Sequence, residues 1–138
     1  MIQLLGGIES TAAALASERV RMDVISQNIA NASTLRGPDG RPYQRQQVVF
    51  ESVLRDRMSG GGPGPAGATA VRVARVEPDP RPPRLVYDPL RGPIEVPNIN
   101  VHEEMADLIS SSRAFEANLA VLKTARSMAM QTLALGKR

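Results

Sequence analysis

The chain has 138 residues, enough for one domain of ordinary size, and it carries a formal charge of +3. It contains no cysteine and one histidine, His102, which excludes disulfides, cysteine-ligated zinc, iron–sulfur clusters, a thiol nucleophile and a multi-histidine metal site. Aromatic residues make up only 3% of the chain, so any hydrophobic core must be aliphatic.

The first segment, residues 1–31, contains no proline and is predicted to form a helix from about Leu4 to Ala30. Apolar residues recur along it at heptad spacing, and Glu18 interrupts the stripe they form. A stripe of this kind is typical of a helix that packs along a second helix. The heptad positions are Leu4, Ile8, Thr11, Leu15, Glu18, Met22, Ile25 and Ile29.

The middle segment, residues 32–97, holds all 11 prolines of the chain and most of its basic excess. Because proline costs about 3 kcal/mol inside a helix, short strands and turns are expected here. The sequence Gly-Pro-Asp-Gly at residues 37–40 predicts a turn, and the Gly/Pro-rich run at 59–67 is interpreted as a flexible linker. The candidate strands are residues 43–50, 70–76, 85–87 and 94–96.

The last segment, residues 98–138, is predicted to form a second and longer helix. Asn100 followed by Glu103 has the spacing of a capping box, and Gly136 is a natural C-terminal cap. At 1.5 Å per residue this helix would be about 54 Å long, too long for a compact ball of this size. Its apolar stripe runs through Met105, Leu108, Phe115, Leu119 and Leu122.

The pattern as a whole predicts a mainly α fold in which the long terminal helices pair as a coiled coil around a small, irregular β-containing central segment. Two long helices cannot cover each other's apolar faces completely, and the central segment is too polar and broken to cover the rest. Exposed apolar stripes on long helices usually bind partner helices. The sequence therefore favours a subunit of an assembly over a self-contained enzyme.

Two other classes of function stay open at this point. The central arginines favour binding to nucleic acid or an anionic surface, although they are interleaved with acids and few aromatics are present to stack on bases. A hydrolase using His102 and the nearby Glu103, Glu104 and Asp107 is a further possibility, but these residues suit the polar first turn of a helix better. The serines at 110–112 have no evident base and are interpreted as a small-residue helix face. We therefore expect no enzyme activity, no metal and no cofactor.

Membrane insertion is not expected, because no apolar run reaches the roughly 18–20 residues that a membrane span requires. The first residues also lack the positive stretch and the continuous apolar core of a cleavable signal peptide. The chain is therefore expected to be cytoplasmic or to be exported without such a peptide.

Two stretches resemble a known family. Residues 17–34 contain Asn-Ile-Ala-Asn at positions 28–31 and, together with residues 36–40 and 43–45, are similar to the N-terminal signature of bacterial flagellar rod and hook proteins. Residues 97–105, followed by residues 112–118, resemble the C-terminal signature of the same family.

The resemblance is strongest to the short members of the proximal rod, because of the chain length and the sequence at residues 84–89. The segment at residues 90–96 is shorter than in those proteins, and Phe115 replaces the usual tyrosine.

The resemblance implies a structural subunit of the flagellar proximal rod that assembles with other rod proteins into a helical tube crossing the periplasm and transmitting torque. Implied partners are other rod subunits, copies of the same chain and the rod base at the MS-ring, without nucleic acid or direct membrane insertion. Type III export without a cleaved signal peptide is also implied. The expected organisation is a coiled-coil core formed by residues 1–31 and 98–138, with residues 32–97 as a projection.

Asn28 and Asn31 are expected to satisfy backbone groups where the first helix ends. The residues expected at the assembly interface are Ile8, Leu15, Met22, Ile25, Asn28, Ile29 and Asn31 of the first helix, and Met105, Leu108, Phe115, Leu119 and Leu122 of the second.

Overall fold

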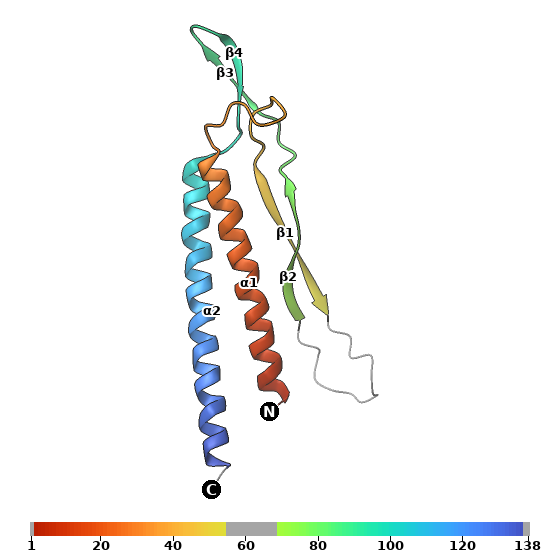
Figure 1. Cartoon of the computed structure of the whole chain (residues 1–138), viewed down its shortest axis with the longest axis vertical. Helices are drawn as coiled ribbons and strands as arrows, with labels where there is room; N and C mark the ends of the chain where they lie inside the picture. The colour runs from red at the N-terminus through yellow and green to blue at the C-terminus, as the bar shows by residue number, and fades with distance from the viewer. Residues whose placement is uncertain (1, 55–68, 137–138) are drawn as a thin grey trace.

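The computed structural model describes residues 2–54 and 69–136, which form two long helices and four strands (Figure 1). A mainly helical protein with helical flanks around a β-containing centre is confirmed. The linker expected at residues 59–67 lies outside the described residues. The elements are α1 (Ile2–Ala30), β1 (Gln46–Leu54), β2 (Thr69–Pro78), β3 (Arg84–Asp88), β4 (Gly92–Val96) and α2 (Val101–Leu135).

The two helices end at residues that satisfy their free backbone groups. At the end of α1, the side-chain amide of Asn31 donates to the carbonyl of Gln27 at 2.9 Å. At the start of α2, the side chain of Asn100 accepts from the backbone N–H of His102, one residue earlier than the capping-box spacing predicts. At the other end, the N–H of Gly136 donates to the carbonyl of Thr132.

The helices lie side by side and run antiparallel, with both chain termini at the same end of the molecule (Figure 1). The antiparallel hairpin of β1 and β2 lies along α1, so α1 is the middle of three layers. This hairpin covers part of α1, which the polar composition of the centre did not predict. Ser17, buried in α1, donates to the carbonyl of Val71 in β2, and its small side chain leaves room for the strand backbone.

The two hairpins are placed differently. β1 and β2 pair from Gln46 opposite Pro78 to Leu54 opposite Thr69, with an irregularity between Val49 and Phe50. β3 and β4 form a separate two-stranded sheet at the far end of the molecule, and in the described part of the chain this sheet packs on no other helix or strand. Of the two described hairpins, the second is a projection of the kind expected for the whole centre, and the first is not.

The molecule is elongated and has a very small apolar core. Of the described apolar side chains, Val24 and Ile25 are buried, together with Pro97. The other buried side chains in the described part are polar or charged: Ser17, Asn28, Asp79, Glu104 and Ser111. These buried polar groups lie where the layers meet, and they define the candidate site.

Candidate assembly interface

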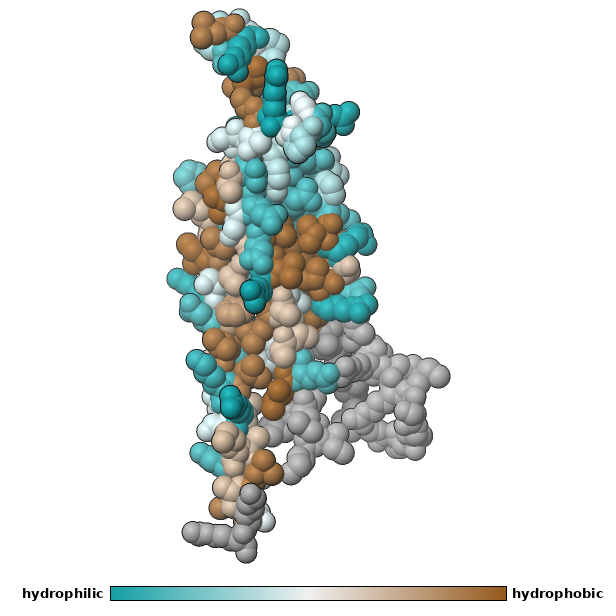
Figure 2. All heavy atoms as spheres, in the orientation of Figure 1, coloured by the Kyte–Doolittle hydropathy of each residue, from teal (hydrophilic) through white to brown (hydrophobic). Residues whose placement is uncertain are grey.

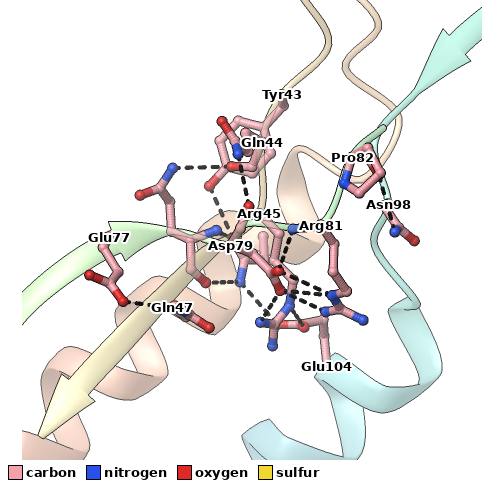
Figure 3. A network of polar contacts seen from close by, with 12 residues as sticks. Tyr43, Gln44, Arg45, Gln47, Glu77, Asp79, Arg81, Pro82, Asn98 and Glu104 are labelled. Atoms are coloured by element: carbon pink, nitrogen blue, oxygen red, sulfur yellow. Dashed lines mark hydrogen bonds and ion pairs between the residues drawn. The ribbon is translucent and has the colours of Figure 1, made fainter. Parts of the chain in front are cut away.

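A network of buried polar side chains joins the end of α1, the start of α2 and the base of the β1–β2 hairpin (Figure 3). Asn28 is at its centre and is only 1% exposed. Its Nδ2 donates to the carbonyl of Gln46 at 2.9 Å and to Oε2 of Glu104 at 3.1 Å. Its Oδ1 accepts from the N–H of Gln46 at 2.9 Å and from the hydroxyl of Tyr43 at 3.2 Å.

These contacts explain why the residue at position 28 is an asparagine. Its amide has two donor hydrogens and two acceptor positions, and all four are used. Facing Gln46, the amide acts as a backbone peptide group would, donating to the carbonyl and accepting from the N–H. An aspartate at this position would lose both donors and place a second carboxylate beside Glu104. Asn28 therefore acts on β1 and α2 rather than on the end of α1, where we expected it.

Glu104 and Arg45 form the charged part of the network. The carboxylate of Glu104 is nearly buried, and Nε of Arg45 donates to its Oε1 at 2.6 Å. Nη1 of the same arginine reaches Oδ2 of Asp79 at 3.1 Å. Because a buried charge is costly without a partner, these ion pairs hold α2 against the segment before β1 and the segment after β2.

Asp79 is held by a second arginine as well. Nη2 of Arg81 donates to Oδ2 of Asp79 at 2.7 Å, and the backbone N–H of Arg81 donates to Oδ1 at 3.0 Å. These hydrogen bonds from Arg81, assisted by Arg45, lower the pKa of the Asp79 carboxyl from 3.8 to about 2. Asp79 therefore stays ionised in the folded protein, and the two acids and two arginines of the network balance in charge.

Tyr43 connects the network to the turn that follows α1. Its backbone N–H donates to the carbonyl of Thr34, and the hydroxyl of Thr34 donates to Oδ1 of Asn31. Burial raises the pKa of the Tyr43 hydroxyl, and the negative charge of Glu104 raises it further. The turn expected at residues 37–40 is confirmed, because the N–H of Gly40 donates to the carbonyl of Gly37 at 3.0 Å.

The two signature stretches of the sequence thus meet in space. Asn28 and Asn31 come from the first stretch, and Glu104 comes from the second. The sequence predicts a helix-dipole role for Glu104, and it places Arg45 within the N-terminal signature without giving it a role. It does not single out Asp79 or Arg81. The partners of these residues are distant in sequence, so no local pattern identifies them.

A second polar contact joins the helices farther along their length. The hydroxyl of Ser111, which is 2% exposed, donates to the carboxylate of Glu18. Glu18 is the residue that interrupts the apolar stripe of α1. The sequence analysis identified Glu18 as an interruption of the apolar stripe and Ser111 as part of a face of small residues. It did not predict that the two residues are in contact.

The residues expected at the assembly interface differ in exposure. Ile25 and Asn28 are buried, whereas Met105 is 51% exposed. Of this set, the structure links Asn28 directly to α2 through its hydrogen bond to Glu104. The other expected residues are partly exposed: Ile8, Leu15, Met22, Ile29 and Asn31 on α1, and Leu108, Phe115, Leu119 and Leu122 on α2.

Large apolar side chains remain exposed along α2 and on the β3–β4 hairpin. Figure 2 shows apolar side chains spread over the helical part and at the far end of the hairpin. On the hairpin and its turn, Tyr87 is 75% exposed and Leu90 is 95% exposed. On α2 the exposed set comprises Val101, Met105, Ile109, Val121, Met128, Met130, Leu133 and Leu135. Such surfaces on a small protein mark sites of association.

Within residues 2–54 and 69–136, no group of three or more histidine, aspartate and glutamate side chains is arranged to hold a metal ion. His102 is exposed on the first turn of α2. No helix in the described ranges has the length and apolar character needed to cross a membrane.

Comparison with known proteins agrees with the two signatures. The family model of the flagella basal body rod protein matches residues 8–36, and that of the flagellar basal body rod FlgEFG protein C-terminal region matches residues 91–135. A flagellar basal-body rod protein FlgC from Borreliella burgdorferi is 40% identical, over 96% of this chain and 97% of the relative. Proteins of the same name from Yersinia enterocolitica and Bacillus subtilis are each 37% identical. These two alignments cover 99% and 92% of this chain, and 100% and 94% of the respective relatives.

Proposed function

Because the chain belongs to the family of flagellar basal-body rod proteins, we propose that it assembles with copies of itself and with other rod subunits into the helical tube of the proximal rod. It is a structural subunit of the basal-body rod and not an enzyme. The tube would transmit torque across the periplasm, and its base would contact the MS-ring. Subunits would reach it by type III export without a cleaved signal peptide.

One observation carries this proposal: the fold leaves many large apolar side chains of α2 exposed. Only a few apolar side chains are buried within the described chain, while α2 exposes apolar residues from its first turn to its last. A single subunit therefore buries too little apolar surface to satisfy its own helices, and neighbouring subunits would supply the rest. Contacts between unlike surfaces of identical subunits that do not close into a ring generate a helix.

The interface proposed within this assembly consists of the two apolar stripes. Residues of α1 from Ile8 to Ile29 and of α2 from Met105 to Leu122 would pack within and between subunits, in the manner of a coiled coil. The terminal segments 1–31 and 98–138 would then form the core of the tube. The β3–β4 hairpin would contact a neighbouring subunit through its exposed apolar residues.

The alternative, binding to nucleic acid or an anionic surface, is not supported. Several central arginines are already paired with carboxylates: Arg45 and Arg81 in the buried network, and Arg72 and Arg75 with Glu51 and Glu77 on the β1–β2 hairpin. Arginines paired in this way are less available to phosphate groups.

The test is deletion of the gene in its own host, followed by electron microscopy of the basal bodies. Cells lacking the protein should have no hooks or filaments, and the wild-type gene should restore both. The variant Leu122→Asp should be produced but should not restore assembly, because it would bury an unpaired charge in the helix seam. Thr124→Asp, two residues farther along α2 at an exposed position, is the matched control and should restore assembly.

Two results would contradict the proposal. Normal flagella in the deletion strain, with a second gene copy excluded, would overturn the rod function. Full motility with Leu122→Asp would leave the rod function intact but would refute the placement of Leu122 in the seam.

A further inference from the structure

The contact between Glu18 and Ser111 is unusual because it places a carboxylate in the seam between two helices. Glu18 occupies a heptad position that is apolar at most other repeats of α1. Its carboxylate accepts the hydroxyl hydrogen of Ser111, which is buried on α2. A carboxylate in such a seam is tolerated only with a hydrogen-bond donor nearby, so the pair restricts how the helices can align.

The residues on either side of Ser111 show how strong this restriction is. Sliding α2 by half a heptad would place Glu18 opposite Asp107 or Leu108 in one direction, or opposite Ala114 or Phe115 in the other. None of these side chains can donate a hydrogen bond to an ionised carboxylate.

Sliding by a full heptad gives two further alignments. One places Glu18 opposite Glu104, which brings two carboxylates together. The other places it opposite Asn118, which does offer a donor. That second shift, however, would separate Glu104 from both Asn28 and Arg45, which bind it in the observed alignment. Only the observed alignment satisfies both polar links.

We propose that the Glu18–Ser111 pair is an alignment determinant: it selects one register of α1 against α2 and so sets which residues of α2 are offered to the next subunit. Buried polar residues in helix seams have this effect in coiled coils, where they fix register at a cost in stability. The pair thus determines the alignment of the two helices, and it does not add to the stability of the fold.

The register has a direct consequence at the far end of the helix pair. With Asn28 beside Glu104 and Glu18 beside Ser111, the start of α1 lies opposite roughly residue 128 of α2. The last turns of α2 therefore extend beyond α1, as Figure 1 shows, and they carry the exposed Met130, Leu133 and Leu135. The inference that this extension is a contact surface rests on the proposed rod function. The inference about the alignment of the helices does not depend on that function.

The experiment uses spin labels in the full chain, which has no cysteine of its own. Cysteines at the exposed positions Ser26 and Ala117 carry the labels, and their separation along the helix axis is about 20 Å in the observed register. Electron–electron distance measurements then report the register directly. The parent chain for these measurements carries Glu104→Ala, because the bonds of Glu104 to Asn28 and Arg45 would otherwise hold the observed alignment by themselves. The test variant adds Glu18→Leu with Ser111→Ala to this chain. The matched control adds Asp23→Leu with Ser110→Ala, at exposed positions of the same helices.

The parent chain and the control should each give one narrow distance. The test variant should remain helical and at least as resistant to heat, but should show a second distance displaced by about 10 Å, the length of one heptad. A single unchanged distance in the test variant would overturn the proposal, as would a broad distribution in the parent chain.

Basal-body assembly gives a separate readout. The test variant should assemble poorly even though it is folded, whereas the control should assemble as well as the parent chain that carries Glu104→Ala. Normal assembly by a variant with a mixed register would refute the link between alignment and assembly. Because the distance measurement needs no rod, failure of the rod function would leave the alignment result valid.

Discussion

At the scale of single residues, most of the buried side chains in the described part of the chain are polar or charged. Asn28 uses all of its hydrogen-bonding capacity, and Glu104 is bound by both Asn28 and Arg45. Removing one member of such a buried pair leaves an uncompensated charge, at a cost of about 3–5 kcal/mol. Substitutions that remove one member of the network should therefore be strongly destabilising.

The Asp79 carboxylate provides a pH-dependent test of this network. Its folded-state pKa, about 2, lies below the ordinary value of 3.8, chiefly because Arg81 donates hydrogen bonds to it. The stabilisation that the ionised carboxylate provides is therefore fully present above about pH 4 and is lost as the pH falls toward 2. Asp79→Asn should lower the free energy of unfolding at neutral pH, and this difference should shrink between pH 4 and pH 2.

Acid titration of the Asp79 side chain by NMR checks the cause. In the wild-type chain the carboxyl should titrate near 2, and in Arg81→Gln its pKa should move up toward 3.8. A pKa that is the same in both chains would show that Arg81 is not the main cause.

At the scale of elements, the two hairpins have different support. β1–β2 lies along α1 and is joined to the helices through the network at its base. β3–β4 packs on no other described element, and an isolated two-stranded hairpin is marginally stable in water. Its turn is therefore important: the carboxylate of Asp88 accepts from the N–H groups of Leu90 and Arg91, and Gly92 has a φ of +77°.

Substitution of Gly92 should weaken this hairpin alone. Gly92→Ala meets no atom within 4 Å, so its cost is that of a left-handed backbone, about 1–2 kcal/mol. Amide exchange in β3 and β4 should accelerate while global unfolding is unchanged. Gly7→Ala is the matched control, because Gly7 lies in α1 with open space around it, and this change should stabilise the helix by about 0.5–1 kcal/mol. Equal effects of the two substitutions would contradict this view of the turn.

At the scale of the whole molecule, the long shape and small core predict uneven stability. The buried groups cluster around Val24, Ile25 and the network, whereas the last turns of α2 are exposed. Apolar burial and tertiary contacts, rather than helix propensity, stabilise most helices in proteins. The subunit should therefore be firmly folded near the network and weakly folded toward the start of α1 and the end of α2.

Amide hydrogen exchange on a dilute, isolated chain measures this gradient. Protection should be greatest around Val24 and Ile25 and should decline toward the start of α1 and the end of α2. Incorporation into a rod should extend the protection along both helices. Strong and uniform protection of both helices in the isolated chain would contradict the prediction.

The sequence by itself determined the two helices, the non-helical centre and the family. The ring of proline prevents it from fitting inside an α-helix. Because all prolines lie within residues 32–97, the two flanking segments were predicted to be helical. The turn at residues 37–40 and the ends of the helices were also predictable, because their contacts are made within a few residues. Pairing of the helices as a coiled coil stays a prediction, as does the set of interface residues.

Only the tertiary structure decided which polar residues meet. Asn28 and Glu104 are separated by 76 positions, and Arg45 and Asp79 by 34, so no spacing along the chain relates them. The same holds for Glu18 and Ser111. In the sequence, Glu18 only interrupts an apolar stripe and Ser111 only belongs to a face of small residues, whereas in the structure the two side chains are hydrogen-bonded. Local periodicity reflects the geometry of one element, whereas a buried polar group is satisfied by whichever donor or acceptor the packed layers bring to it.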